Sequence, residues 1–162
     1  MTFEIRLAET GEDIKQCAEM MAASDPWKRL ARSAQECETS LRHPNIRLDV
    51  AVEGKAITGF LASLENGVGF EPLIEYLCVG EAARNRGVGS GLIDFFERKL
   101  YPESANLYLF VSDLNPNAQR LYLRLGYVPV GALPNYNLIT QTEFLFRKTR
   151  GPRSDMPSPW TT

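Results

Sequence analysis

The stretch LIEYLCVGEAARNRGVGSGLIDFF, residues 73–96, contains the most informative change of pattern in the chain. Its first part, Leu73–Val79, is apolar except for Glu75, as in a strand that is buried on both faces of a sheet. The glycine-rich segment Arg84-Asn-Arg-Gly-Val-Gly-Ser-Gly91 follows, and apolar residues then recur at helical spacing from Leu92. This order predicts a central strand, a glycine-rich turn and a helix with one buried face.

The glycine-rich turn is predicted to bind an anion. It brings free backbone N–H groups and the positive end of a helix dipole to one point. A Walker loop is excluded, because no Gly-Lys-Ser/Thr ending follows Gly87-Val-Gly-Ser-Gly91. A dinucleotide fingerprint is also excluded, because it would need a glycine where Leu92 stands. Arg84 and Arg86 suit charge-assisted phosphate contacts; the alternative, that an arginine here only solvates the helix entrance, has more weight for Arg86 than for Arg84.

The flanking sequence predicts the other elements by periodicity, capping residues and turn signals. Helices are expected to begin after Thr10, Ser33 and Asn115, and a turn is expected at Asn66-Gly67. Strands are expected at residues 3–7, 46–52, 56–64, 73–79, 107–111, 127–130 and 143–147. The resulting order β, α, α, β, β, β, α, β, α, β, β predicts an α/β (α+β) fold, with a mixed sheet and helices on both faces.

Length and composition are those of one globular domain. The chain has 162 residues, of which 44% are hydrophobic and 23% charged. No repeat or internal linker divides it, so residues 1–150 are predicted to form a single domain. The remainder, 151–162, holds three prolines with polar spacers and is expected to be a mobile tail.

Charge and cysteine usage exclude several classes of function. The formal net charge of −2 provides no broad positive field, so nucleic acid is not an expected partner. The N-terminus lacks signal-peptide features, and the longest uncharged run, 125–142, contains two prolines, two glycines and three polar amides, so neither export nor a membrane is expected. Cys17, Cys37 and Cys78 are odd in number, far apart and without a CxxC motif, which predicts buried thiols in a reducing, cytoplasmic compartment. Because His43 is the single histidine, no metal site is expected.

Three segments together resemble the GNAT superfamily of N-acetyltransferases. Arg84-x-x-Gly87-x-Gly89 resembles the family's R/Q-x-x-G-x-G/A loop, which follows its fourth strand, and Leu77-Cys-Val79 resembles its L-x-V strand end. The segment from Asn115 to Tyr127, NPNAQRLYLRLGY, is similar to the family pattern N-x-x-A-x-x-L-Y-x-x-L-G-F. The resemblance covers residues 73–131 and implies the GNAT fold, whose central mixed sheet is mostly antiparallel.

The resemblance implies acetyl-CoA as co-substrate. Its pyrophosphate would lie over the N–H groups of the turn, Gly87, Val88, Gly89, Ser90 and Gly91, with Arg84 and Arg86 beside it. Its pantetheine would lie along the strand end at Leu77, Cys78 and Val79. Asn115 matches a family residue that contacts the cofactor, and it also serves as a helix cap.

The resemblance also suggests the groups that carry out acyl transfer. The family's general acid is a tyrosine that matches Tyr122, which would also border the cofactor and whose alternative role is that of a core aromatic. Glu75 is the one carboxylate inside the apolar strand. It is a candidate base acting through water, or a group that binds the substrate ammonium or pairs with a neighbouring strand. Cys78 is expected to be a packed thiol, and Trp27 is a candidate for lining the acceptor pocket.

The predicted function is therefore acetyl-CoA-dependent transfer of an acetyl group to a primary amine of a small molecule or peptide. One alternative is a non-enzymatic acyl-CoA-binding regulatory module, which would need the phosphate loop but no proton donor. Another is a protein N-terminal acetyltransferase, which would need an open groove. The sequence does not identify the acceptor, and it leaves open a homodimer.

Overall fold

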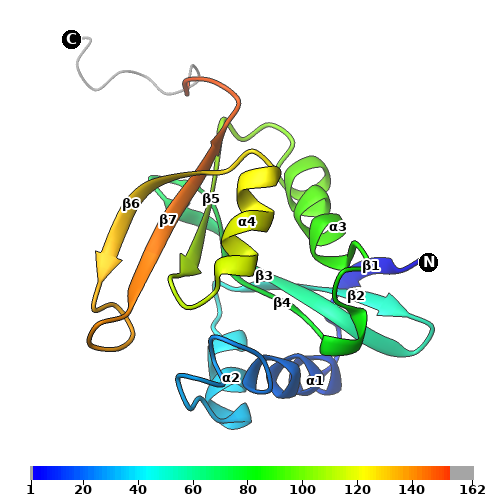
Figure 1. Cartoon of the computed structure of the whole chain (residues 1–162). Helices are drawn as coiled ribbons and strands as arrows, with labels where there is room; N and C mark the ends of the chain where they lie inside the picture. Colours follow the sequence, from blue (N-terminus) through cyan, green and yellow to red (C-terminus); the bar gives the residue numbers. More distant parts are fainter. Residues whose placement is uncertain (1, 154–162) are drawn as a thin grey trace.

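The computed structural model describes residues 2–153 and contains one mixed sheet with helices on both faces (Figure 1). In chain order the elements are β1 (Glu4–Leu7), α1 (Gly11–Ala22), α2 (Ala34–Leu41), β2 (Arg47–Glu53), β3 (Ala56–Val68), β4 (Glu71–Val79), α3 (Val88–Phe95), β5 (Asn106–Ser112), α4 (Pro116–Arg124), β6 (Val128–Pro134) and β7 (Thr142–Thr149). A 3-10 turn at Glu81–Ala83 precedes α3, and a π-helical turn at Phe96–Leu100 follows it. The predicted order of elements is confirmed. No helix within residues 2–153 has the length and apolar character needed to cross a membrane.

The strand order is β1-β2-β3-β4-β5-β7-β6, which makes β4 the central strand, as predicted. All neighbouring strands are antiparallel except β4 and β5, which run parallel. The prediction of a mixed, mostly antiparallel sheet is therefore confirmed.

Apolar residues alternate along the strands and build a core on each face of the sheet. On β3, Phe60 and Ala62 pack in the core beneath α1 and α2, while Leu61 between them packs in the core beneath α3 and α4. Figure 1 shows the two helix pairs on opposite sides of the sheet. Because each face is covered, the ends of the central strands are the places where a site can open.

The parallel pair β4 and β5 is joined over only two residues of each strand, Leu73 with Tyr108 and Ile74 with Leu109. Beyond Ile74, β4 continues to pair with β3 as far as Val79 opposite Gly59, but no longer with β5. The carboxyl-terminal halves of β4 and β5 therefore separate. This separation leaves one edge of β4 without strand partners in the middle of the sheet.

The predicted helix caps are confirmed. Thr10 and Ser33 each form a capping box with the acidic residue three positions later. The Asn115 side chain accepts a hydrogen bond from the Ala118 N–H at 3.1 Å, and Pro116 occupies the first turn of α4. These caps fix where α1, α2 and α4 begin.

Several predicted boundaries are wrong. The β3–β4 turn is not at Asn66-Gly67: β3 extends to Val68, which pairs with Glu71, and the two turn residues are Gly69 and Phe70. Both have positive φ, 57° and 67°, as a two-residue hairpin turn requires, and a phenylalanine in that conformation gives no turn signal in the sequence. β6 and β7 are also longer than predicted, because β7 supplies backbone partners to β6 as far as Pro134, and β5 supplies partners to β7 as far as Thr149.

The predicted tail begins with three described residues, of which Arg153 forms an ion pair with Glu71 at 3.0 Å. The rest of the predicted tail, 154–162, lies outside the described residues.

Replacing Gly67 by alanine is expected to destabilise the fold by about 1–3 kcal/mol. A β-carbon at Gly67 would lie 2.2 Å from the Cβ of Leu73, a core residue that is 4% exposed, so the hairpin would have to shift. The matched change Gly11→Ala meets only Arg42 Nη2 at 3.5 Å and should leave stability equal or slightly higher. Urea denaturation of both variants measures the difference. Wild-type stability of Gly67→Ala would contradict the tight packing at this turn.

Candidate active site

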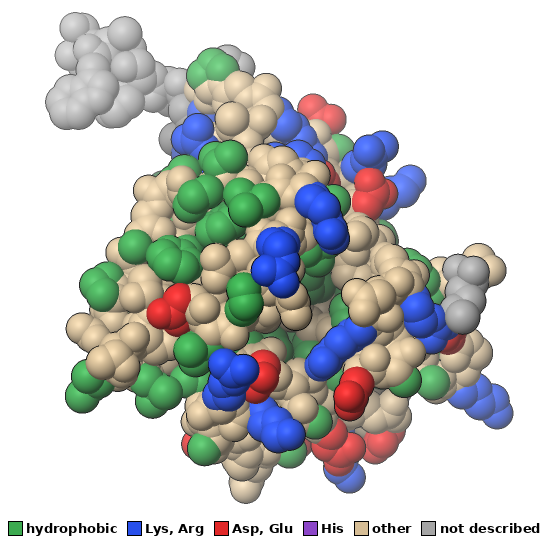
Figure 2. Space-filling model, in the orientation of Figure 1, with side chains coloured by type: hydrophobic (Ala, Val, Ile, Leu, Met, Phe, Trp, Pro, Cys, Tyr) green, Lys and Arg blue, Asp and Glu red, His purple; other side chains and the backbone are tan. Residues whose placement is uncertain are grey.

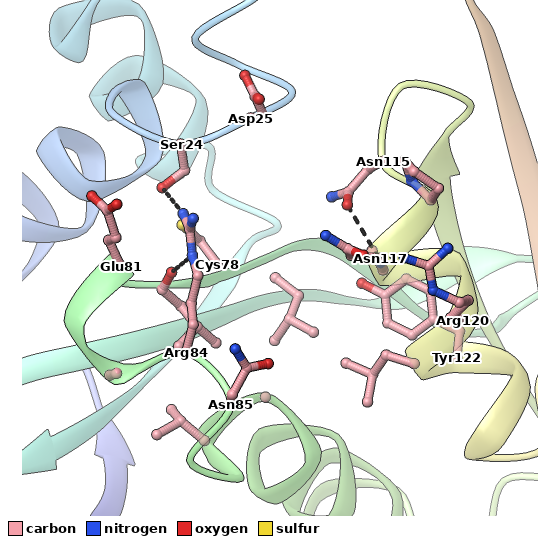
Figure 3. Close-up of a pocket in the computed structure, with 18 of the residues that line it drawn as sticks. Ser24, Asp25, Cys78, Glu81, Arg84, Asn85, Asn115, Asn117, Arg120 and Tyr122 are labelled. Carbon is pink, nitrogen blue, oxygen red and sulfur yellow. Dashed lines mark hydrogen bonds between the residues drawn. The ribbon is translucent and has the colours of Figure 1, made fainter.

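A cavity of about 960 Å³ opens where β4 and β5 separate; we call it the larger cavity. Its wall is built from the end of β4, the loop before α3, the start of α4 and the loop between α1 and α2. Figure 2 shows the hollow on this face with Lys and Arg side chains around it. In Figure 3, Cys78 and Arg84 lie on one side of the cavity, and Asn115 and Tyr122 lie on the other.

The glycine-rich turn presents unpaired N–H groups to the larger cavity. Gly87 precedes α3 with a φ of 83°, a left-handed conformation that favours glycine. The Gly91 N–H donates to the Gly87 carbonyl at 2.9 Å, so the N–H groups of Val88, Gly89 and Ser90 precede the hydrogen-bonded ladder of α3. Gly87, Val88, Gly89 and Ser90 all line the larger cavity. An anion placed there would face three N–H groups and the positive end of the helix dipole.

The structure separates the two arginines of the turn. Arg84 lines the larger cavity, where its Nε donates to the Val79 carbonyl and its Nη2 donates to Ser24 Oγ, both at 3.3 Å. Arg86 lies outside the lining and forms an ion pair with Glu53 at 2.5 Å. Arg84 is therefore placed to contact a ligand, whereas Arg86 joins the turn to β2.

Gly91 also lies outside the cavity lining. A β-carbon there would come within 2.5 Å of the Phe3 ring, so a glycine at this position lets α3 pack against the N-terminal segment.

Basic residues that sequence reasoning missed also line the larger cavity. Lys28 and Arg29 come from the α1–α2 loop, and Arg120 and Arg124 from α4. Arg29 is paired with Asp25 at 3.2 Å, and Arg120 donates to Asn117. Singly, each resembles an ordinary surface cation, and only the fold brings them to one cleft. Together they favour a polyanionic ligand.

The end of β4 contributes Leu77, Cys78 and Val79 to the wall. Cys78 is buried, its Sγ lies 3.8 Å from the Met20 carbonyl as a weak donor, and burial raises the pKa of its thiol to about 11. A thiol with that pKa stays protonated near neutral pH, so Cys78 is unsuited to act as a nucleophile. Cys78 belongs to the part of β4 that does not pair with β5, so this unpaired strand edge lies beside the cavity.

Tyr122 stands between the larger cavity and a second one. The side chain is 5% exposed and its ring packs edge-to-face on Tyr127 and Phe146, at centroid distances of 6.3 and 6.4 Å. Its hydroxyl makes no hydrogen bond within residues 2–153, and burial raises the pKa of the phenol above its ordinary value. Tyr122 is thus both a core aromatic and a protonated donor that faces the site.

The second cavity, of about 230 Å³, lies in the gap between β4 and β5; we call it the smaller cavity. It shares five wall residues with the larger cavity: Trp27, Leu77, Asn115, Ala118 and Tyr122. Glu75 lines the smaller cavity only, and burial raises the pKa of its carboxyl. No group within residues 2–153 forms a hydrogen bond or ion pair with the Glu75 carboxylate. The alternative that Glu75 pairs with a neighbouring strand is therefore not supported.

Sequence reasoning missed Glu143, a second carboxylate in the smaller cavity. It lies at the start of β7, opposite Ser112 of β5, and no local motif marks it. Its burial raises the pKa of its carboxyl, while hydrogen bonds from Gln141 and Asn137 act in the opposite direction. Within the described part of the chain, no cluster of three or more His, Cys, Asp or Glu side chains is arranged to hold a metal ion.

Solved structures with the same fold include several acetyltransferases. An aminoglycoside 6'-N-acetyltransferase complexed with coenzyme A superposes with a TM-score of 0.75 at 19% identity, over 93% of this chain and 98% of that one. The aminoglycoside 6'-N-acetyltransferase from Enterococcus faecium gives 0.72 at 20%, over 93% and 98%. The ribosomal-protein-S18-alanine N-acetyltransferase from Escherichia coli gives 0.74 at 16%, over 94% and 98%. No curated protein sequence matches the chain significantly.

The family model of the acetyltransferase (GNAT) family matches residues 11–127, from α1 to the end of the α4 segment. That span contains the glycine-rich turn, the end of β4 and Tyr122, and it exceeds half of the chain. The fold and the motifs expected from the sequence agree with this match. The chain therefore belongs to the GNAT acetyltransferase family and is an acyltransferase.

Proposed function

We propose that this acyltransferase moves an acetyl group from acetyl-CoA directly to a primary amine of a small molecule or peptide. One observation carries the proposal. The larger cavity is suited to a polyanion, the smaller cavity contains a carboxylate without a partner among residues 2–153, and Tyr122 lines both. The first cavity fits the co-substrate and the second fits an amine. The acyl carbon would pass between them at their shared wall.

The chain's own groups fit acetyl-CoA. The N–H groups of Val88, Gly89 and Ser90 would hold the diphosphate, assisted by Arg84. The edge of β4 beyond Ile74 has N–H and C=O groups without strand partners, which can pair with the amides of the pantetheine arm. A volume of about 960 Å³ lies in the range of cofactor pockets, roughly 300–1,000 Å³.

The acceptor must be a neutral amine before it attacks. Deprotonating a lysine-type amine of pKa about 10.4 at pH 7 costs roughly 4.6 kcal/mol, whereas an α-amine of pKa about 8 costs only about 1.4 kcal/mol. Burial raises the pKa of Glu75, which makes its carboxylate a stronger base than an exposed one. Glu75 would take the proton directly or through water, or it would hold the ammonium until the proton leaves.

In the transfer itself, the amine nitrogen bonds to the thioester carbonyl carbon, and the carbon–sulfur bond then breaks. A backbone N–H at the unpaired edge of β4 near Cys78 or Val79 would stabilise the carbonyl oxygen as it gains charge. The Tyr122 hydroxyl would donate its proton to the departing sulfur. Although burial raises the pKa of this phenol, the same surroundings would also raise the proton affinity of a thiolate.

The comparisons do not identify the acceptor. The relatives named for aminoglycosides or for ribosomal protein S18 are 16–20% identical, which supports the fold but not a shared substrate. Family membership disfavours the non-enzymatic acyl-CoA-binding module, and the small volume next to Tyr122 disfavours an open peptide groove. A cytoplasmic location and a homodimer stay predictions.

Acetyl-CoA is expected to stabilise the protein, whereas ATP and NADH are not, because the turn lacks both nucleotide fingerprints. At a ligand concentration about one hundred times the Kd, binding contributes about 2.7 kcal/mol, which for a chain of this size raises the Tm by roughly 5–10 °C. A thermal shift assay measures this. An equal shift with ATP would contradict the assignment of the larger cavity.

Gly89→Asp is expected to weaken acetyl-CoA binding by a factor of about ten or more, because it places a carboxylate where the diphosphate would lie. Gly89→Ala is the matched control: its β-carbon would lie 3.5 Å from Val79 Cγ2 and 3.6 Å from Leu121 Cδ2, which is ordinary contact. Its effect should be much smaller. Calorimetric titration measures the affinity of both variants. Unchanged affinity in folded Gly89→Asp would show that the diphosphate does not bind at this turn.

Tyr122→Phe is expected to lower kcat roughly a hundredfold while leaving the Kd for acetyl-CoA nearly unchanged. The ring contacts with Tyr127 and Phe146 remain, so only the proton donor is lost. Tyr108→Phe on β5, outside both cavities, is the control and should keep wild-type turnover. The measurement is thiol release with any accepted amine. Wild-type turnover in Tyr122→Phe would show that another group protonates the leaving thiolate.

A further inference from the structure

The smaller cavity holds two carboxylates that come from different strands, Glu75 from β4 and Glu143 from β7. Glu143 is 7% exposed, and its Oε1 accepts hydrogen bonds from Asn137 Nδ2 at 3.0 Å and Gln141 Nε2 at 3.1 Å. Its other oxygen, Oε2, has no partner within residues 2–153. The two neutral amides therefore hold the carboxylate in one orientation and leave its second oxygen available to a ligand.

No cation of the described chain pairs with either carboxylate. Arg32 also lines the smaller cavity, but its Nη2 donates to Ser40 Oγ at 3.0 Å and to the Glu36 carbonyl at 3.4 Å. Negative charges from Glu75 and Asp113 add to the burial that raises the pKa of Glu143. One buried and one half-buried carboxylate without a counter-ion are costly, and a bound ammonium would reduce that cost.

The remaining walls favour ammonium groups and limit size. Trp27 packs edge-to-face on Tyr76 at a centroid distance of 6.2 Å, and Phe110 stacks on Tyr136 at 5.9 Å. All four aromatic residues line the smaller cavity. Aromatic faces attract cations and do not offset the charge of an anion. A volume of about 230 Å³ admits only a compact group.

We propose that the smaller cavity selects compact diamines, in which one amine reacts beside Glu75 and Tyr122 while a second ammonium pairs with Glu143 Oε2. This inference rests on the proposed function, because it assigns a substrate class to the same site. It makes Glu143 a specificity-determining residue that takes no part in proton transfer. It also explains why Asn137 and Gln141 reach in from the β6–β7 connection to hold that side chain.

The test compares three probes with the same four-carbon backbone: 1,4-diaminobutane, butylamine and 4-aminobutyrate. Their binding is measured by calorimetry with CoA present, so that binding is read without turnover. The diamine is expected to bind the wild-type protein at least about tenfold more tightly than butylamine, because one more ion pair forms in a buried site. The carboxylate of 4-aminobutyrate would meet Glu143 and should make it the weakest ligand.

Glu143→Gln keeps an oxygen acceptor for Asn137 and Gln141 but removes the charge. The ratio of the butylamine Kd to the 1,4-diaminobutane Kd should therefore fall to about one. Glu103→Gln, an exposed carboxylate outside both cavities, is the control and should keep the wild-type preference. An unchanged thermal shift with CoA shows that each variant is folded. The comparison of the three probes on the wild-type protein tests the proposal even if a variant fails to fold.

The outcomes separate this inference from the proposed function when thiol release from acetyl-CoA is followed with the same amines. Diamine binding no tighter than that of butylamine, or a preference that survives Glu143→Gln, overturns the inference even if amines are acetylated. Selective, Glu143-dependent diamine binding without thiol release supports the cavity assignment and overturns acetyl transfer.

Discussion

The two-residue junction between β4 and β5 is the constraint on which the site depends. Parallel strands that stayed paired would close the middle of the sheet, and both cavities would disappear. Pairing ends instead at Ile74 and Leu109, while β3 holds β4 on one side and β7 holds β5 on the other. The fold can therefore open an unpaired strand edge in its interior, because neither strand relies on the other for most of its hydrogen bonds.

Everything that the proposed chemistry requires is arranged around that opening. The chain leaves β4 at Val79 and turns into α3 through Gly87, so the N–H groups of the helix start lie at the mouth of the gap. After β5 the chain enters α4, which Asn115 caps and which carries Tyr122 to the wall that both cavities share. The crossover topology thus places the groups proposed to bind phosphate and the proposed proton donor on opposite sides of one cleft.

The features predicted well from the sequence are those with local causes. A capping side chain accepts its hydrogen bond from a backbone N–H three residues later, and the φ of residue 87 itself favours glycine. Both features can therefore be recognised in a short segment of the sequence. The central position of β4 also followed from its apolar residues. In contrast, Arg86 of the loop before α3 pairs with Glu53 of β2, and Glu143 reaches the site only through its register opposite Ser112. Such contacts depend on long-range pairing that no short segment of the sequence encodes.

The same side chain can pack in the core and also present a polar group to the proposed site. Tyr122 contributes to the packing of two aromatic neighbours, and its hydroxyl has no hydrogen-bond partner among residues 2–153. Glu75 stands in an otherwise apolar strand and also lacks a partner in the described part of the chain. A structural role alone would favour phenylalanine and an aliphatic residue at these positions, since a polar group in largely apolar surroundings costs free energy when it is desolvated without a compensating partner. Polar atoms retained at that cost, and directed at one gap in the sheet, are best accounted for by a ligand that pairs with them.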